Sequence, residues 1–247
     1  MMPITHAALS GLDACFENVL ELTAEADRFL HEPESAEAIR EEFATCGFVK
    51  VPAILPAEAH TALMAALWPI LSPIAEQVTL LHVPRPEHAL SDGARFWRVD
   101  PYCFRHPVIR EKMSDLLGKL GLVEFGSLLA EKLTPLIRYV AGPLTFRRVY
   151  FYLYKEGDYI SVHDDHHVGQ RVDVQFPLTL GACAGIRVLS DGFLKMHYDS
   201  AGAMNILGPC VWHDVPPLTR GVAGIEPQRF NIGFRFTPDD ASTEAER

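Results

Sequence analysis

The chemistry in this sequence centres on one histidine and one acid separated by a single residue, His163 and Asp165. Because side chains alternate along a strand, a strand predicted at 158–165 carries both on the same face. An imidazole and a carboxylate on one face form half of a chelating set. His213 lies far enough along the chain for a later strand to return beside the first. The three side chains together would offer one face of donors to a divalent metal ion.

A third group of residues follows His213, in the segment 229–236. Alternation predicts one apolar face and one polar face, and the polar face carries Arg229, Asn231, Gly233 and Arg235. An arginine that faces the inside of a barrel is costly without an anion to meet it. A dicarboxylate would supply that anion through a bidentate guanidinium pair.

With Tyr154, Gly157-Asp158 and Ala184-Gly185-Ile186, these motifs resemble those of the iron(II)- and 2-oxoglutarate-dependent oxygenases, in the prolyl-4-hydroxylase-like branch. The resemblance covers roughly residues 145–237. A His-x-Asp pair alone occurs by chance in many proteins. The pair followed by a distal histidine and an Arg-aromatic strand is far more specific.

The resemblance implies roles for six residues. His163, Asp165 and His213 would hold Fe(II), with open positions left for 2-oxoglutarate and O2. Arg229 would bind the distal carboxylate of 2-oxoglutarate, and Tyr154 would help to hold it. Asn231, on the same strand face as Arg229, joins them as a cofactor-binding residue.

One departure from the family pattern concerns this arginine. Arg229 follows His213 by sixteen residues, a longer gap than the family shows. A loop insertion at 220–228 would restore the register, which leaves Arg220 as a rival anchor and Arg235 as a weaker one. A second alternative is an Asp165-x-His167 ligand pair in place of His163, against the family order of His before Asp. Asp164 is expected to lie on the surface or to contact one of the metal ligands without binding the metal itself.

The resemblance further implies a dioxygenase that hydroxylates an unactivated C–H bond and releases succinate and CO2. A carboxylate at position 165 favours hydroxylation, desaturation or cyclisation over halogenation. A small molecule, an amino acid or a natural-product intermediate, is the expected substrate. The alternatives are a peptidyl or protein hydroxylase, and a cupin-like metal-binding protein that does not use 2-oxoglutarate.

The elements that would position these residues change character along the chain. The first half shows helical periodicity, and residues 72–106 are expected to be a long loop with some strand. From residue 144 the period is two, as in Arg148–Tyr154. Further strands are predicted at 158–165, 171–180, 184–189, 193–197, 202–207, 210–215 and 229–236. Short strands at such close spacing indicate a sandwich or barrel.

We therefore expect one α+β domain over residues 1–247. Its core at 144–237 would be a double-stranded β-helix, the jelly roll of cupin-like proteins. The mainly helical residues 1–143, with short strands, would pack outside that core. The tail at 238–247 is expected to be flexible.

Composition restricts the partners. The net charge is −10, which argues against binding to nucleic acid or to an anionic membrane surface. The five cysteines are scattered without a CxxC motif, which favours a reducing cytoplasm. No run of about 18 or more apolar residues is present to span a bilayer. We expect a cytoplasmic protein with a small-molecule substrate.

Overall fold

The structure, a computed structural model, describes residues 6–81, 93–100, 107–165 and 171–239 of the chain. Helices dominate up to residue 141: α1 (His6–Leu20), α2 (Ala24–His31), the 3-10 turn η1 (Pro33–Ala36), α3 (Glu37–Cys46), α4 (Ala57–Leu71), α5 (Pro107–Lys119) and α6 (Leu122–Ala141). Strands in this half are β1 (Phe48–Val51), β2 (Glu76–Leu81) and β3 (Gly93–Val99).

Strands dominate the rest of the chain. They are β4 (Leu144–Lys155), β5 (Tyr159–His163), β6 (Val172–Leu180), β7 (Ala182–Cys183), β8 (Gly185–Ser190), β9 (Phe193–Tyr198), β10 (Met204–Leu207), β11 (His213–Val215), β12 (Thr219–Arg220) and β13 (Gln228–Pro238). Each strand predicted from the period-two pattern has a counterpart here. Strands thus dominate from residue 144, but β1, β2 and β3 of the first half also join the large sheet instead of packing outside it.

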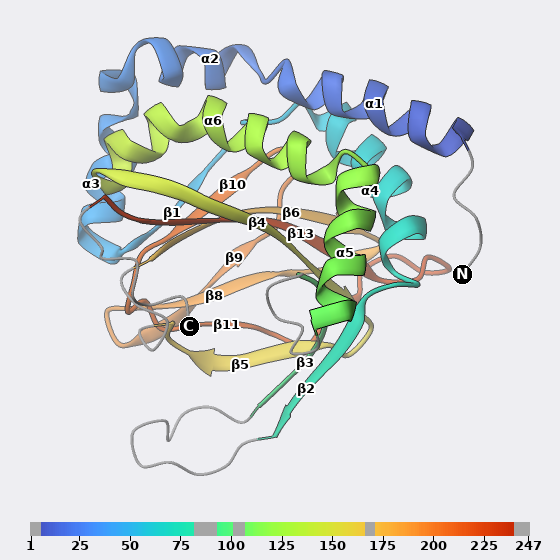
Figure 1. The fold of residues 1–247 in the computed structure, drawn as a ribbon. Coiled ribbons are helices and arrows are strands. Elements are labelled where there is room, and N and C mark those ends of the chain that lie inside the picture. The colour runs from blue at the N-terminus through green and yellow to red at the C-terminus, as the bar shows by residue number, and fades with distance from the viewer. Residues whose placement is uncertain (1–5, 82–92, 101–106, 166–170, 240–247) are drawn as a thin grey trace.

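The large sheet folds over on itself. Its strand order is β1-β10-β6-β13-β4-β3-β5-β11-β8-β9, and β2 pairs with β3. Figure 1 shows β4, β13, β6 and β10 beneath the helices, and β5, β11 and β8 on the far side of the barrel. Neighbours that are far apart in sequence, such as β13 between β4 and β6, are typical of Greek-key jelly rolls. The predicted α+β jelly roll with helices outside is confirmed.

Side chains alternate between the two faces of β4 and β13, so these strands border two different environments. Val149, Phe151 and Leu153 of β4 pack with Phe230 and Phe234 of β13 in the apolar core between sheet and helices. The opposite face of these strands carries tyrosines and arginines, which turn into the barrel. The same two strands therefore build a hydrophobic core on one side and a polar site on the other.

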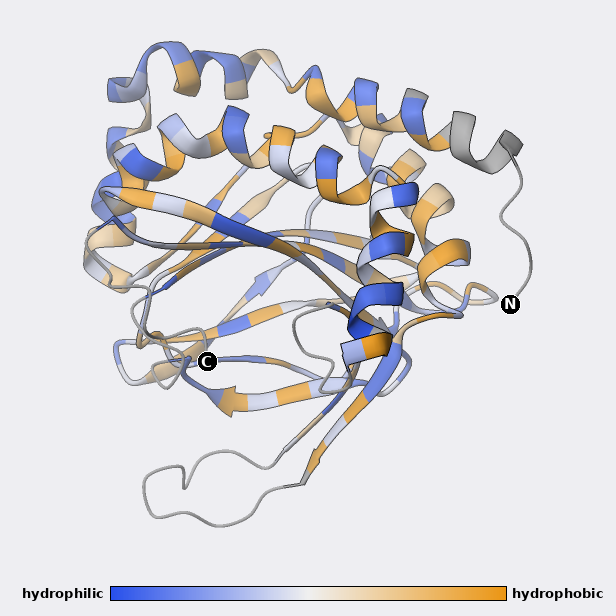
Figure 2. Ribbon diagram, in the orientation of Figure 1, coloured by the Kyte–Doolittle hydropathy of each residue, from blue (hydrophilic) through white to orange (hydrophobic). Residues whose placement is uncertain are grey.

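Helix α6 shows why the first half is helical. Its buried residues recur every three or four positions, and Gly142 ends the helix with a positive φ of 94°. Figure 2 shows hydrophobic and hydrophilic residues alternating along α1 and α6, as expected for helices with one buried face. Among the described residues we find no helix with the length and apolar composition needed to span a membrane.

The segment 72–106 differs from the prediction. Instead of a long loop with some strand, its described residues include two strands, β2 and β3, paired over six positions from Glu76–Arg98 to Leu81–Gly93. Phe96 on β3 is buried, with its ring 6.1 Å from that of Tyr154 on β4. Residues 82–92 and 101–106 lie outside the described residues. So do His167, in the alternative ligand pair, and most of the tail at 238–247.

Candidate metal centre

Two histidines face each other across one ladder of the barrel. His163 is the last residue of β5 and His213 the first of β11, and their Cα atoms are register partners. Their ring centroids lie 4.3 Å apart. Because paired residues project to the same side of a sheet, the β5–β11 pairing alone brings the two imidazoles together.

Asp165 completes the set from just beyond the end of β5. One ligand atom from each of His163, Asp165 and His213 lies within 4.8 Å of the others. This separation suits three donors around a single ion. The structure thus brings together the three residues that the sequence singled out.

Backbone carbonyls fix the orientation of both rings. Nδ1 of His163 is 2.7 Å from the Ser161 carbonyl oxygen, and Nδ1 of His213 is 2.8 Å from that of Val211. A carbonyl only accepts, so each Nδ1 carries the proton and donates. Each Nε2 therefore keeps a free lone pair, the arrangement that metal-binding histidines adopt.

The protonation states of the site suit a metal. Burial lowers the pKa of His163, and the neighbouring His213 lowers it further. Burial acts to raise the pKa of Asp165, but the adjacent guanidinium of Arg171 is the largest cause that opposes it, and that pKa lies below its usual value. A neutral imidazole and an ionised carboxylate are the forms that bind a metal ion.

Arg171 holds the carboxylate of the site from behind. Its Nη2 lies 2.9 Å from Asp165 Oδ2, and its Nε lies 2.8 Å from Asp173 Oδ2. Arg235 Nε lies 3.3 Å from the other oxygen of Asp173. A chain of alternating charge therefore runs from the metal centre to β13. The sequence analysis missed Arg171 and Asp173, although their spacing places both on one face of the predicted strand 171–180.

Arg229 lies inside the barrel, as expected from alternation. It pairs in register with Tyr154 on β4 and with Thr179 on β6. Its side chain is 0% exposed, and its guanidinium carbon lies 5.1 Å from the centre of the Tyr154 ring. Its Nε lies 2.7 Å from Asp199 Oδ2 and its Nη2 3.2 Å from Asp199 Oδ1. Asp199 is a third residue of the site, after Arg171 and Asp173, that was not predicted from the sequence.

One nitrogen of the buried Arg229 guanidinium, beside the Tyr154 ring, is left over by the ion pair with Asp199. Among the described residues, its buried Nη1 has no hydrogen-bond partner. Nearby Asn231 donates from Nδ2 to Gln175 Oε1 at 3.4 Å, while its buried Oδ1 also has no partner there. Buried polar atoms without partners are rare, and a bound ligand is one way to satisfy them.

The rival arginines are placed differently. Arg220 lies on β12 with 49% of its side chain exposed, and its Nη2 is 3.1 Å from Glu156. It is a surface residue rather than an anchor in the barrel. Arg235 does turn inward, but Asp173 pairs with it and its guanidinium lies over the Tyr150 ring. Of the three candidates, Arg229 alone combines full burial with a free N–H edge.

No protein-family model matches the sequence, and a comparison with curated proteins finds no match. Solved structures do match. An oxidoreductase of the 2OG-Fe(II) oxygenase family from Burkholderia pseudomallei is 15% identical, with a TM-score of 0.50, over 81% of this chain and 90% of that one. A prolyl-4-hydroxylase from Pseudomonas putida is 18% identical, with a TM-score of 0.51, over 82% and 98%.

A third similar structure is the epimerase SnoN in complex with Fe3+, alpha ketoglutarate and nogalamycin RO. It is 14% identical, with a TM-score of 0.54, and the match covers 84% of this chain and 85% of that one. At these identities the likeness concerns the fold. The chain therefore has the fold of the 2OG-Fe(II) oxygenases.

Proposed function

We propose that the chain is an Fe(II)- and 2-oxoglutarate-dependent dioxygenase that hydroxylates an unactivated C–H bond of a small molecule. The observation that carries this proposal is the meeting of His163, Asp165 and His213 within 4.8 Å on an oxygenase fold. Two histidines and one carboxylate are the ligand set of non-haem Fe(II) oxygenases.

The residues of the chain divide the work. His163, Asp165 and His213 would hold the iron. Iron bound by them would, with 2-oxoglutarate and O2, supply the oxidising chemistry that yields succinate and CO2. The protein's own contribution is placement: backbone carbonyls orient both imidazoles, and Arg171 orients the carboxylate.

Arg229 and Tyr154 are the residues that we assign to the distal carboxylate of 2-oxoglutarate. The buried Nη1 of Arg229, which has no hydrogen-bond partner among the described residues, offers N–H donors to this carboxylate. Asn231 supplies a neighbouring amide on the same face of β13. The guanidinium of Arg229 is not fully available to a co-substrate, because its Nε already donates to Asp199.

Two alternative functions remain to be compared with this proposal, a cupin-like metal protein and a peptidyl hydroxylase. A 2-oxo acid gives the buried Nη1 of Arg229 a partner, whereas a cupin-like metal protein that does not use 2-oxoglutarate leaves this nitrogen without one among the described residues. A peptidyl hydroxylase is the second candidate, because a prolyl-4-hydroxylase is among the similar structures. We place the small molecule first because SnoN, which has the higher TM-score, is bound to nogalamycin RO.

We further propose that the protein works in the cytoplasm. Within the described part of the chain, Cys15, Cys46, Cys183 and Cys210 are all free thiols. Free cysteines at exposed positions suit a reducing compartment.

The test is metal-dependent turnover of 2-oxoglutarate. We expect the purified chain with Fe(II) and O2 to form succinate from 2-oxoglutarate, at a rate that rises when the substrate is present. Asp165→Ala should abolish this, whereas Asp164→Ala, the adjacent acid, should retain it. A screen of amino acids, natural-product intermediates and proline-containing peptides by mass would identify the substrate class.

The mass change also separates the reactions. Hydroxylation adds one oxygen atom to the product, whereas desaturation and cyclisation remove hydrogens. Failure of every 2-oxo acid to bind or turn over with Fe(II) would contradict the proposal. It would leave the cupin-like alternative.

A further inference from the structure

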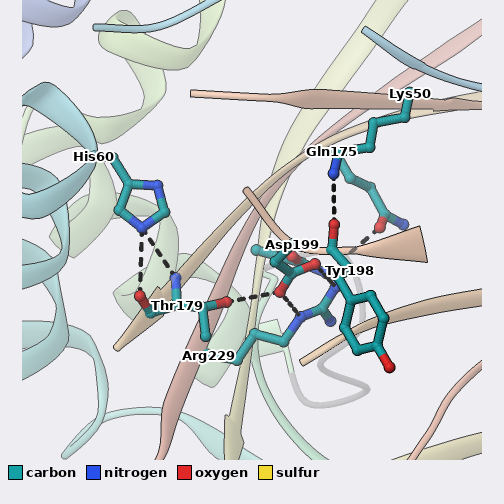
Figure 3. Close-up of polar contacts among 8 residues, drawn as sticks. Lys50, His60, Gln175, Thr179, Tyr198, Asp199 and Arg229 are labelled. Carbon is teal, nitrogen blue, oxygen red and sulfur yellow. Dashed lines mark hydrogen bonds and ion pairs between the residues drawn. The ribbon is translucent and has the colours of Figure 1, made fainter. Parts of the chain in front are cut away.

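A carboxylate of the protein itself lies on the proposed co-substrate anchor. Asp199, the residue after β9, directs its side chain into the barrel toward Arg229 (Figure 3). Its Oδ2 accepts hydrogen bonds from Arg229 Nε at 2.7 Å and from Thr179 Oγ1 at 2.6 Å. Its Oδ1 lies 3.2 Å from Arg229 Nη2. The cradle formed by Arg229 and Thr179 is thus a carboxylate site that already holds a carboxylate.

The pair is closed off from solvent. The side chain of Arg229 is 0% exposed and that of Asp199 is 4% exposed. Buried opposite charges in hydrogen-bonding contact cancel each other's field. A second carboxylate arriving at Arg229 therefore meets a neutral pair rather than a free cation. It also comes close to a like charge in a medium where charges are poorly screened.

Asp199 cannot move away with a flexible loop. Its backbone N–H donates to the Ala184 carbonyl oxygen at 3.0 Å. The carbonyl oxygen of the preceding residue, Tyr198, lies 2.5 Å from Lys50 Nζ, as Figure 3 shows. The carbonyl oxygen of Gly202, in the turn that follows, accepts hydrogen bonds from two backbone N–H groups of the segment after β1. These hydrogen bonds hold the backbone of Asp199 beside the cradle.

We propose that Asp199 sets the co-substrate selectivity of the site by neutralising Arg229. The inference rests on the proposed function and adds the residue that determines which 2-oxo acid binds. The distal carboxylate of 2-oxoglutarate gains little at a neutral anchor. The metal centre therefore accepts 2-oxo acids with a short uncharged tail nearly as well as 2-oxoglutarate. The free Nη1 of Arg229 and the Tyr154 ring supply the remaining contacts for the tail.

The first test compares ligands on the wild-type chain. Dissociation constants for 2-oxoglutarate and 2-oxobutanoate are measured by calorimetry on the Fe(II)-loaded protein under anaerobic conditions. We expect the two constants to differ by less than about tenfold, since a tenfold ratio is only about 1.4 kcal/mol. A preference of more than about 100-fold for 2-oxoglutarate would overturn the inference without any variant.

The second test removes the internal charge. Asp199→Asn keeps the shape of the side chain and an oxygen for Arg229 and Thr179. We expect this variant to lower the dissociation constant of 2-oxoglutarate by about tenfold or more. The dissociation constant of 2-oxobutanoate should change by less than about twofold, because this ligand has no second carboxylate. An unchanged or weaker affinity of folded Asp199→Asn for 2-oxoglutarate would refute the assignment.

Asp158→Asn is the matched control. Asp158 is also a buried carboxylate paired with an arginine, with Oδ1 2.8 Å from Arg95 Nε, but it does not bind Arg229. Its replacement should leave both dissociation constants unchanged, and tightening by both variants alike would overturn a specific role for Asp199. If no 2-oxo acid binds to any of these proteins, the proposed function itself fails. If 2-oxoglutarate binds but Asp199→Asn has no effect, only this inference fails.

Discussion

His163 and His213 are register partners on adjacent antiparallel strands, and their rings lie 4.3 Å apart. The β5–β11 ladder is therefore part of the metal centre as well as part of the barrel. Each ring is also held by a carbonyl oxygen two residues before it, at Ser161 and Val211. The geometry of the ligands is in this way built into the backbone of two short strands.

Loss of the carboxylate ligand should abolish metal binding. Asp165→Ala leaves two neutral imidazoles, so we expect Fe(II) affinity to fall by more than the roughly 10–100-fold that loss of an outer partner costs. Asp164→Ala should bind as wild type does. Calorimetric titration with Fe(II), and circular dichroism to check the fold, would measure this. Equal affinities in the two variants would contradict the assignment.

Arg171 should affect the metal centre without touching the metal. Arg171→Met removes the charge 2.9 Å from Asp165, so we expect metal affinity to fall by about 10–100-fold. Arg187→Met provides the comparison, because Arg187 pairs with Asp214, which is not one of the proposed ligands. That variant should retain the wild-type dissociation constant. Wild-type metal affinity in Arg171→Met would show that the ion pair only stabilises the fold.

Gly233 is required by the packing inside the barrel. A Cβ atom there would overlap the ring of Tyr150, which lies across β13 at this point. We expect Gly233→Ala to lower the free energy of unfolding by about 1–3 kcal/mol. Gly118→Ala, in α5 with open space around it, should be neutral or stabilising by up to about 1 kcal/mol. Urea denaturation of both variants checks the contrast.

Stability should fall in mild acid because of His60. Burial is the largest cause that lowers its pKa below the ordinary 6.5, and its Nε2 accepts a hydrogen bond from the Thr179 N–H. His60 therefore binds a proton more readily in the unfolded chain than in the folded one. The free energy of unfolding decreases as the pH falls below the ordinary histidine pKa of 6.5. The lowered pKa values of His163 and His197 act in the same direction.

His60→Gln should flatten this pH dependence. Urea titrations between about pH 8 and about pH 5 would show a smaller loss of stability in the variant than in wild type. His31→Gln, at an exposed position on α2, should keep the wild-type slope. A slope in His60→Gln as steep as that of the wild type would contradict the prediction.

The Arg229–Asp199 pair should show strong coupling in stability. Arg229→Met leaves a buried carboxylate without its cation, so we expect a loss of about 3–5 kcal/mol. The double variant Arg229→Met/Asp199→Asn should recover most of it, because no unpaired charge remains. Urea denaturation of the single and double variants measures the coupling, and additive losses would contradict it. Arg220→Met, on the surface, should stay close to wild type.

The sequence by itself determined the local half of the site. His163 and Asp165 are two residues apart, so alternation predicts both on one face, although β5 ends at His163 and Asp165 lies just beyond it. The same rule turns Arg229, Asn231 and Arg235 away from the apolar face of β13. The change of period near residue 144 likewise indicated where strands come to dominate the chain, because burial on one face of a strand leaves a pattern of period two. It did not indicate that β1, β2 and β3 from the first half join the same sheet.

Only the tertiary structure decided the partners of these residues. Pairing of β5 with β11 brings His213 to His163, and the return of the chain after β9 puts Asp199 on Arg229. Arg171, just before β6, likewise meets Asp165, just after β5, in an ion pair that was not predicted. Periodicity reports which face of a strand is buried but not which strand lies beside it. The sequence therefore predicted a buried arginine at position 229, and only the tertiary structure showed that the carboxylate of Asp199 pairs with it.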